Sequence, residues 1–183
     1  MALIDKLASA ERLIVAGIGM LERGEDALAI HVVAASAMNM LRELYETKRG
    51  DYQARVFQEA FFIAGAAQAA GQPIALGDHR LIEEAVTWVS EQIAAGKMTD
   101  SSQLEITLSD ADAKALLAYI YKPYNFLKHG DRDPLSTLDE TDIEPEGVIQ
   151  HALLLFSWLD KDRLFPESIR PFAERHGIIK VPD

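Results

Sequence analysis

The 183-residue chain contains no cysteine, which excludes disulfide bonds, thiolate-bound metals and a cysteine nucleophile. A chain without disulfides suits a reducing compartment, so we expect a cytoplasmic protein. The sequence also lacks a run of about 20 apolar residues, the length that a membrane-spanning helix needs. Charges at Asp5, Lys6 and Glu11 interrupt the apolar stretch that a secretory signal requires. We therefore predict neither a secretory signal nor a membrane partner.

Positive charge is scarce, with 18 lysines and arginines against 29 acidic residues and a formal net charge of -11. Such a surface repels a phosphate backbone, so nucleic-acid binding is not expected except at a local basic patch. Hydrophobic residues make up 49% and charged residues 26% of the chain, as in folded globular proteins. The length suits one domain, which we expect to span residues 1–183.

Apolar residues recur at helical spacing along most of the chain. Their pattern predicts helices over residues 2–22, 25–47, 51–70, 78–95, from 110 onward, 145–160 and 166–176. Asp51 and Asp78 are predicted N-caps, and Gly24 and Gly71 are predicted stops. Residues 97–109 do not show a helical pattern, and we expect an extended surface loop there. The sequence therefore predicts an all-α fold, a single-domain bundle of about six to seven helices.

The segment 122–133, KPYNFLKHGDRD, gathers several kinds of polar side chain. If a helix passes through it, Lys122, Asn125 and His129 lie at i, i+3 and i+7, on one face. Imidazole titrates near neutrality, so His129 could act as a general acid or base. Lys122 or Arg132 could hold an anionic group. We therefore predict His129, Asn125 and Lys122 as catalytic residues.

The side chains around this face are predicted to bind a ligand: Tyr124, Asp131, Arg132 and Asp133. The same segment also has a purely architectural interpretation. Lys128 and His129 would complement a helix dipole, and Gly130 would end the helix. The two aspartates before Pro134 would then form an ordinary turn.

Asn125-x-x-x-His129 in an all-helical chain resembles the HEPN family, whose signature is an arginine, usually a polar residue after it, and a histidine a few residues later. Members of that family are helical bundles that often dimerise. Many are ribonucleases, and others are non-catalytic binding modules. The position expected to hold arginine is Tyr124 here, and Lys122 is a possible substitute at longer spacing.

The resemblance implies a mechanism for the ribonuclease members, in which histidine activates a ribose hydroxyl and arginine stabilises the developing charge. Tyr124 cannot supply that charge, and Lys122 lacks the bidentate fork of arginine. We therefore expect a non-catalytic homodimer or a protein that binds another protein. The alternative is a metal-independent ribonuclease that uses His129.

His31 lies in the most apolar part of the second predicted helix. A buried imidazole needs a hydrogen-bond partner, and a carbonyl group is the commonest one. Alternatively, His31 meets His129 and forms a small-ligand pocket within the bundle. Three polar residues further along the same helix are expected to form an internal network: Asn39, Arg42 and Glu43.

The five histidines do not form the H-x-x-x-H, H-E-x-x-H or repeated E-x-x-H patterns of metal-binding helices. The sequence also lacks a Walker A loop, a dinucleotide-binding glycine motif and a nucleophile elbow. We therefore expect no metal site and no cofactor.

Overall fold

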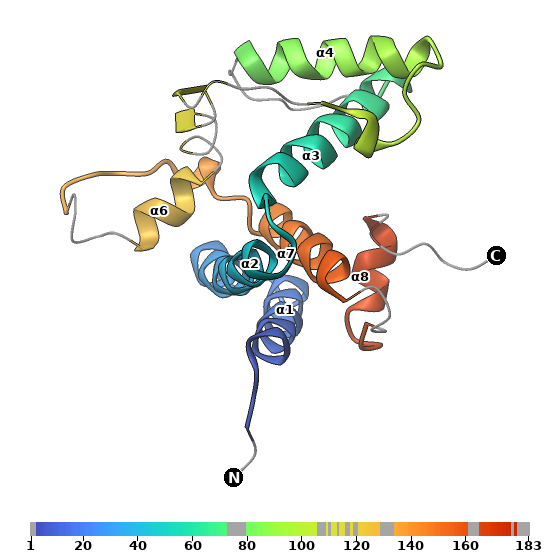
Figure 1. The fold of residues 1–183 in the computed structure, drawn as a ribbon. Helices are drawn as coiled ribbons and strands as arrows, with labels where there is room; N and C mark the ends of the chain where they lie inside the picture. Colours follow the sequence, from blue (N-terminus) through green and yellow to red (C-terminus); the bar gives the residue numbers. More distant parts are fainter. Residues whose placement is uncertain are drawn as a thin grey trace. The chain divides into compact units, whose positions relative to one another are not determined.

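A computed structural model describes residues 3–72, 80–105, 109, 111–112, 114–115, 118, 121–128, 134–160, 165–176 and 178. Every regular element within these residues is a helix, and seven of them are α-helices (Figure 1). The all-α fold class is therefore confirmed. The chain forms two compact units: unit 1 is Met1–Gly50 with Ala113–Asp183, and unit 2 is Asp51–Asp112. The single domain over residues 1–183 stays a prediction.

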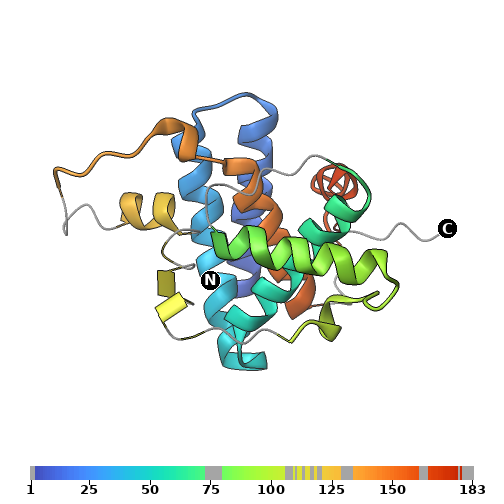
Figure 2. The same ribbon diagram turned by 90° about the horizontal axis from the view of Figure 1, so that it is seen from above.

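Unit 1 is built on three helices, α1 (Lys6–Glu22), α2 (Ala27–Arg49) and α7 (Pro145–Leu159). Each of the three packs against the other two, and they run alongside one another in Figures 1 and 2. A short link joins α1 to α2, and these two helices pack against each other as an antiparallel hairpin. Gly24, at a φ of 65°, supplies the left-handed conformation that turns the chain between them.

Helix α2 supplies the centre of this unit, as its sequence predicts. Seven of its side chains are buried: Ile30, His31, Ala34, Ala35, Ala37, Met38 and Leu41. Among the described helices, α2 alone is long and apolar enough to cross a membrane by length and composition. Its packing between α1 and α7 accounts for that composition, because a helix at the centre of a bundle is apolar on several sides.

Three short helices are also part of unit 1. Helix α6 (Lys122–Lys128) packs against α2, and the 3-10 helix η2 (Glu140–Asp142) precedes α7. Helix α8 (Arg170–Arg175) follows α7, and the predicted range of 166–176 was too long. Residues 167–169 form a turn instead, and α8 has a proline in its first turn, where the missing N–H costs no hydrogen bond.

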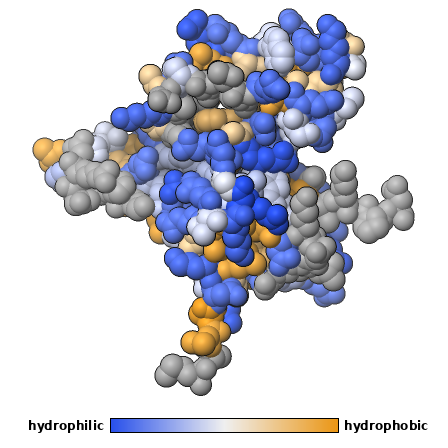
Figure 3. Space-filling model, viewed as in Figure 1, coloured by the Kyte–Doolittle hydropathy of each residue, from blue (hydrophilic) through white to orange (hydrophobic). Residues whose placement is uncertain are grey.

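The first helix also begins later than its apolar pattern predicts, at residue 6 and not at residue 2. The side chain of Asp5 accepts a hydrogen bond from Ala8 N at 2.7 Å and so caps the helix at that point. Leu3, which lies inside the predicted range of 2–22, is 98% exposed. Figure 3 shows the hydrophobic atoms of this preceding segment.

Unit 2 is a hairpin of α3 (Tyr52–Ala69) and α4 (Arg80–Ala94), followed by the 3-10 helix η1 (Ser101–Gln103) (Figure 1). The predicted N-cap of α3 is confirmed, since the Asp51 side chain accepts a hydrogen bond from the backbone of α3. The predicted N-cap of α4, Asp78, lies outside the described residues. The hairpin is closely packed at Gly65, where an added Cβ would lie only 2.5 Å from a Val89 methyl carbon.

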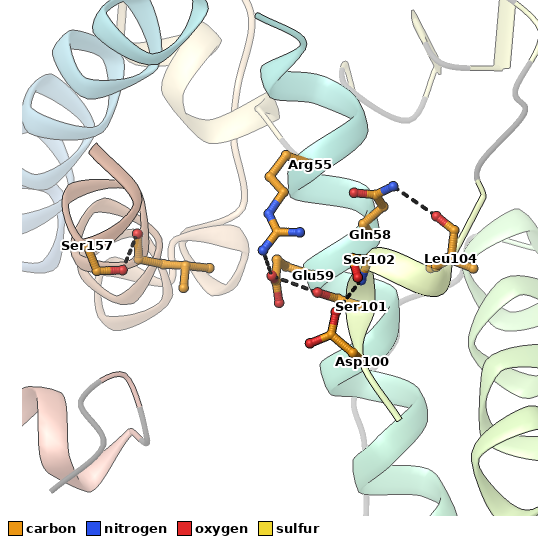
Figure 4. Close-up of polar contacts among 9 residues, drawn as sticks. Arg55, Gln58, Glu59, Asp100, Ser101, Ser102, Leu104 and Ser157 are labelled. Atoms are coloured by element: carbon orange, nitrogen blue, oxygen red, sulfur yellow. Dashed lines mark hydrogen bonds and ion pairs between the residues drawn. The ribbon is translucent and has the colours of Figure 1, made fainter. Parts of the chain in front are cut away.

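A polar network holds η1 against α3 (Figure 4). Glu59 forms an ion pair with Arg55 and accepts a hydrogen bond from Ser101 Oγ at 2.8 Å. The neighbouring residue, Gln58, donates from its Nε2 to the carbonyl oxygen of Leu104 at 2.9 Å. These contacts turn part of the expected extended loop into a fixed helical turn.

Candidate functional site

The described part of the predicted site is helix α6, which begins at Lys122. Pro123 lies in its first turn, where a proline is compatible with a helix because no intrahelical N–H is lost. The helical turn is closed by Asn125 N, which donates to the carbonyl oxygen of Tyr121 at 2.8 Å. The proline therefore lies at the start of a helical segment, and the helix that the predicted face of Lys122 and Asn125 requires is present at these residues.

Lys122 and Asn125 are both exposed, one helical turn apart on α6. Lys122 is paired with a carboxylate, because its Nζ donates to Asp142 Oδ2 at 2.6 Å. The two side chains are 56% and 39% exposed, so the pair lies at the surface of unit 1. The ammonium group thus already has a negative partner at the position where a phosphate would have to bind.

A second carboxylate contributes to the charge around Lys122. The side chain of Asp139 accepts hydrogen bonds from the N and Oγ1 atoms of Thr141, at 2.9 and 2.7 Å. These bonds lower the pKa of Asp139, and the charge of Lys122 lowers it further. The surroundings of Lys122 are therefore anionic, which opposes the binding of a phosphate.

His129, Asp131, Arg132 and Asp133 lie outside the described residues. The shared face of Asn125 and His129 consequently stays a prediction, and so does a pocket between His129 and His31. Tyr124, at the position where the HEPN signature has arginine, is half-buried on α6.

His31 is only 3% exposed, as its apolar surroundings on α2 predict. Within the described residues, neither of its ring nitrogens has a hydrogen-bond partner, so the expected carbonyl partner is wrong. Burial lowers the pKa of His31, because a charged imidazolium is poorly solvated there. An imidazole in this state is neutral at physiological pH and carries two unused polar atoms.

The predicted polar network on α2 is confirmed. Arg42 Nη2 donates to Asn39 Oδ1 at 3.0 Å, and Asn39 Nδ2 donates to Glu43 Oε1 at 3.3 Å. The Nε atom of Arg42 is buried and has no hydrogen-bond partner within the described residues. The network is partly exposed, not wholly internal as expected.

Two further histidines, which the sequence did not single out, lie in or beside α7. Burial lowers the pKa of His151 to about 4. His176 follows α8, and its Nδ1 lies 3.0 Å from Gln150 Nε2 while its Nε2 lies 3.0 Å from Glu146 Oε1. An amide nitrogen can only donate, so Nδ1 accepts and Nε2 carries the proton. His176 thus fastens the end of α8 to α7.

A groove of about 560 Å³ runs along α1. Its lining residues are Val15, Ala16, Ile18, Gly19, Met20, Glu22, Arg23, Glu25 and Ser168. The lining includes no residue of the predicted site. Among the described residues, no cluster of three histidines or carboxylates could hold a metal ion.

Comparisons with protein-family models, curated proteins and solved structures found no match for this chain. The resemblance to the HEPN family therefore rests on Asn125, His129 and the all-α fold. Any function has to be argued from the contacts of individual residues.

Proposed function

We propose that this protein is a non-catalytic, HEPN-like helical protein that acts by binding a second copy of itself or a protein partner. The observation that carries the proposal is the 2.6 Å contact between Lys122 Nζ and Asp142 Oδ2. A ribonuclease of this type needs a free cation to stabilise the charge that develops on the phosphate. The chain has Tyr124 at the arginine position, and its nearest lysine is paired with a carboxylate.

The overall charge supports the same proposal. A net charge of -11 repels RNA, and Asp139 adds to the negative field around Lys122. A substrate would therefore have to overcome repulsion at long range and displace Asp142 at short range. Binding of a protein surface requires neither step.

RNA cleavage tests this proposal directly. We expect the purified protein to leave single-stranded RNA intact in the presence of a chelator. If the protein binds a second copy of itself, light scattering should give a solution mass twice that of one chain. Asp142→Asn removes the negative charge beside Lys122 Nζ, and we expect this variant to be inactive too. Cleavage by the wild-type protein that is lost in His129→Ala would show that the ribonuclease alternative is right.

The imidazole of His31, which has no hydrogen-bond partner among the described residues, favours a second candidate, a bundle that binds a small ligand. A buried group with two unused nitrogens costs stability unless something bonds to it. A ligand with a donor or acceptor group in the core of unit 1 would satisfy it. Native mass spectrometry of freshly purified wild-type protein and His31→Phe would test this candidate, since a bound molecule should be present only in the wild type.

A further inference from the structure

Helix α4 carries apolar residues on two neighbouring faces. Val86, Val89 and Ser90 are buried, on the side where α4 meets α3 at Gly65. A second line follows the spacing i, i+4, i+7 and i+11, which keeps side chains on one face. We define this line as the outer face of α4: Leu81, Ala85, Trp88 and Gln92.

Trp88 is the prominent residue of the outer face, since it is 48% exposed while the other three residues are half-buried. Over α4, Figure 3 shows hydrophobic atoms among hydrophilic ones. Leu81 and Ala85 precede Trp88 by about two turns and one turn, so the indole continues an apolar surface. Tryptophan is enriched at the centres of protein interfaces, where its large ring fills a pocket of the partner.

Carboxylates border this surface. Glu84 precedes Trp88 by four residues and Glu91 follows it by three, so both lie one turn from the indole, and both are exposed. Arg80 pairs with Glu84 at 3.0 Å, but the two side chains are 80% and 59% exposed. A pair this exposed contributes little, so a cation from a partner can replace Arg80.

The negative charges around Trp88 favour some binding partners of the outer face over others. A second copy would bring Glu84 and Glu91 against the same two residues, and nucleic acids or anionic membranes would be repelled. A helix with lysines or arginines on one side and apolar residues on the other would satisfy both the rim and the outer face. Its cations would bind the carboxylates and lie over the Trp88 ring.

We propose that the outer face of α4 binds a basic amphipathic helix of a protein partner, with Trp88 as the apolar anchor and Glu84 and Glu91 as the acidic rim. The inference rests on the proposed function, of which it specifies the partner-binding surface and the chemistry of the partner. It uses only α4, so it does not depend on α6 or His129.

Tryptophan fluorescence can follow binding at this surface. The chain has two tryptophans, and Trp158 packs against Tyr45 with ring centroids 5.8 Å apart. The Trp158→Phe variant therefore leaves Trp88 as the sole reporter, and Trp88→Phe provides the matched control. The probe is a synthetic helix of leucines on one face and lysines on the other, compared with the same helix carrying glutamates. We expect a saturable blue shift in Trp158→Phe with the basic helix, and none with the acidic helix.

Calorimetry then tests the acidic rim. Glu84→Gln with Glu91→Gln should weaken binding of the basic helix about three- to tenfold, as expected for two exposed ion pairs. Glu140→Gln with Glu144→Gln changes the net charge equally on exposed residues outside α4, and should leave the affinity unchanged.

Three outcomes would overturn the inference: no binding in Trp158→Phe, equal binding of the acidic helix, or equal weakening by the control pair at residues 140 and 144. None of them changes the RNA cleavage or mass results. The inference and the proposed function can therefore fail separately.

Discussion

Alanine in place of Gly65 should force α3 and α4 apart. The added Cβ would lie 2.5 Å from Val89 Cγ1, 2.8 Å from Val89 Cβ and 3.0 Å from the backbone nitrogen of Ser90. A β-branched valine in a helix has essentially one rotamer, so its methyl group cannot turn away. The Cβ and backbone atoms move only with α4 itself, and the whole helix must shift.

The expected cost follows from two opposing effects. Overpacking of a core typically costs about 1–3 kcal/mol, and the contacts of 2.5 and 2.8 Å with Val89, together with the Ser90 backbone nitrogen at 3.0 Å, place Gly65→Ala toward the upper end. Alanine in place of glycine inside a helix offsets about 1 kcal/mol of this cost. We therefore expect Gly65→Ala to lower the free energy of unfolding by about 1–2 kcal/mol.

Gly17 of α1 provides a matched control, since it is also buried within a helix. An added Cβ there would lie 3.7 Å from Ile149 side-chain carbons and 3.9 Å from Val33 Cγ1, which are ordinary contacts. Gly17→Ala should consequently raise the free energy of unfolding by about 0.5–1 kcal/mol. The two substitutions are chemically identical and should change stability in opposite directions.

Urea denaturation followed by far-UV circular dichroism would measure both changes. The signal covers both units, so hydrogen exchange at α4 amides should accompany it and locate the loss in Gly65→Ala. If Gly65→Ala is as stable as the wild type or more stable, the close approach of α3 and α4 is wrong.

Three further predictions concern polar side chains that are buried or half-buried. The pKa values of His31 and His151 are lowered in the folded state, so the unfolded state takes up protons first as the pH falls below about 6.5. The free energy of unfolding should therefore decrease as the pH falls through this range. His151, with a pKa of about 4, should contribute a loss of about 3 kcal/mol by pH 4. Denaturation at several pH values should show this slope, and a slope unchanged in His151→Leu would contradict the assignment. His176→Ala should lower the free energy of unfolding by about 1–3 kcal/mol and speed hydrogen exchange in α8, because it removes both bonds to α7. Unchanged hydrogen exchange in α8 would count against this role. Ser101→Ala should lower the free energy of unfolding, measured by thermal denaturation, by about 1 kcal/mol, because it removes the hydrogen bond to Glu59. Ser102 is exposed, so Ser102→Ala should change this free energy little. Equal losses in the two variants would exclude the hydrogen bond to Glu59 as the cause.

The helices were predictable because their signals are local. The N-cap Asp51 and the stop at Gly24 lie within a few residues of the ends that they set. The error at residue 2 arose because the apolar period continues through Leu3, whereas the cap at Asp5 decides where the helix begins. Periodicity describes a face of a helix and does not mark its first residue.

The contacts of the candidate site were not predictable in the same way. The partner of Lys122 is 20 residues further along the chain, in a stretch with many carboxylates. Ser101 and Glu59 are separated by 42 residues. Spacing along a helix identifies pairs within one or two turns, and pairs between elements depend on how those elements pack.

Burial of His31 followed from its apolar neighbours, but its missing partner did not. A sequence shows that an imidazole lies in an apolar helix. It does not show the hydrogen bonds of that imidazole, because these depend on the atoms of other helices. The same limit applies to Trp88, since its position in a helical pattern does not show that the side chain is 48% exposed.

The order of the units along the chain has a consequence for protein synthesis. Unit 2, Asp51–Asp112, is made between α2 and α7, although α2 packs against α7. At ~5–20 residues per second, the ribosome needs roughly 5–20 s to make the ~100 residues between them. During that interval the α1–α2 hairpin lacks the helix that covers its remaining apolar face. A nascent chain that stops before Pro145 therefore exposes the apolar surface of α2 that α7 covers in the complete protein.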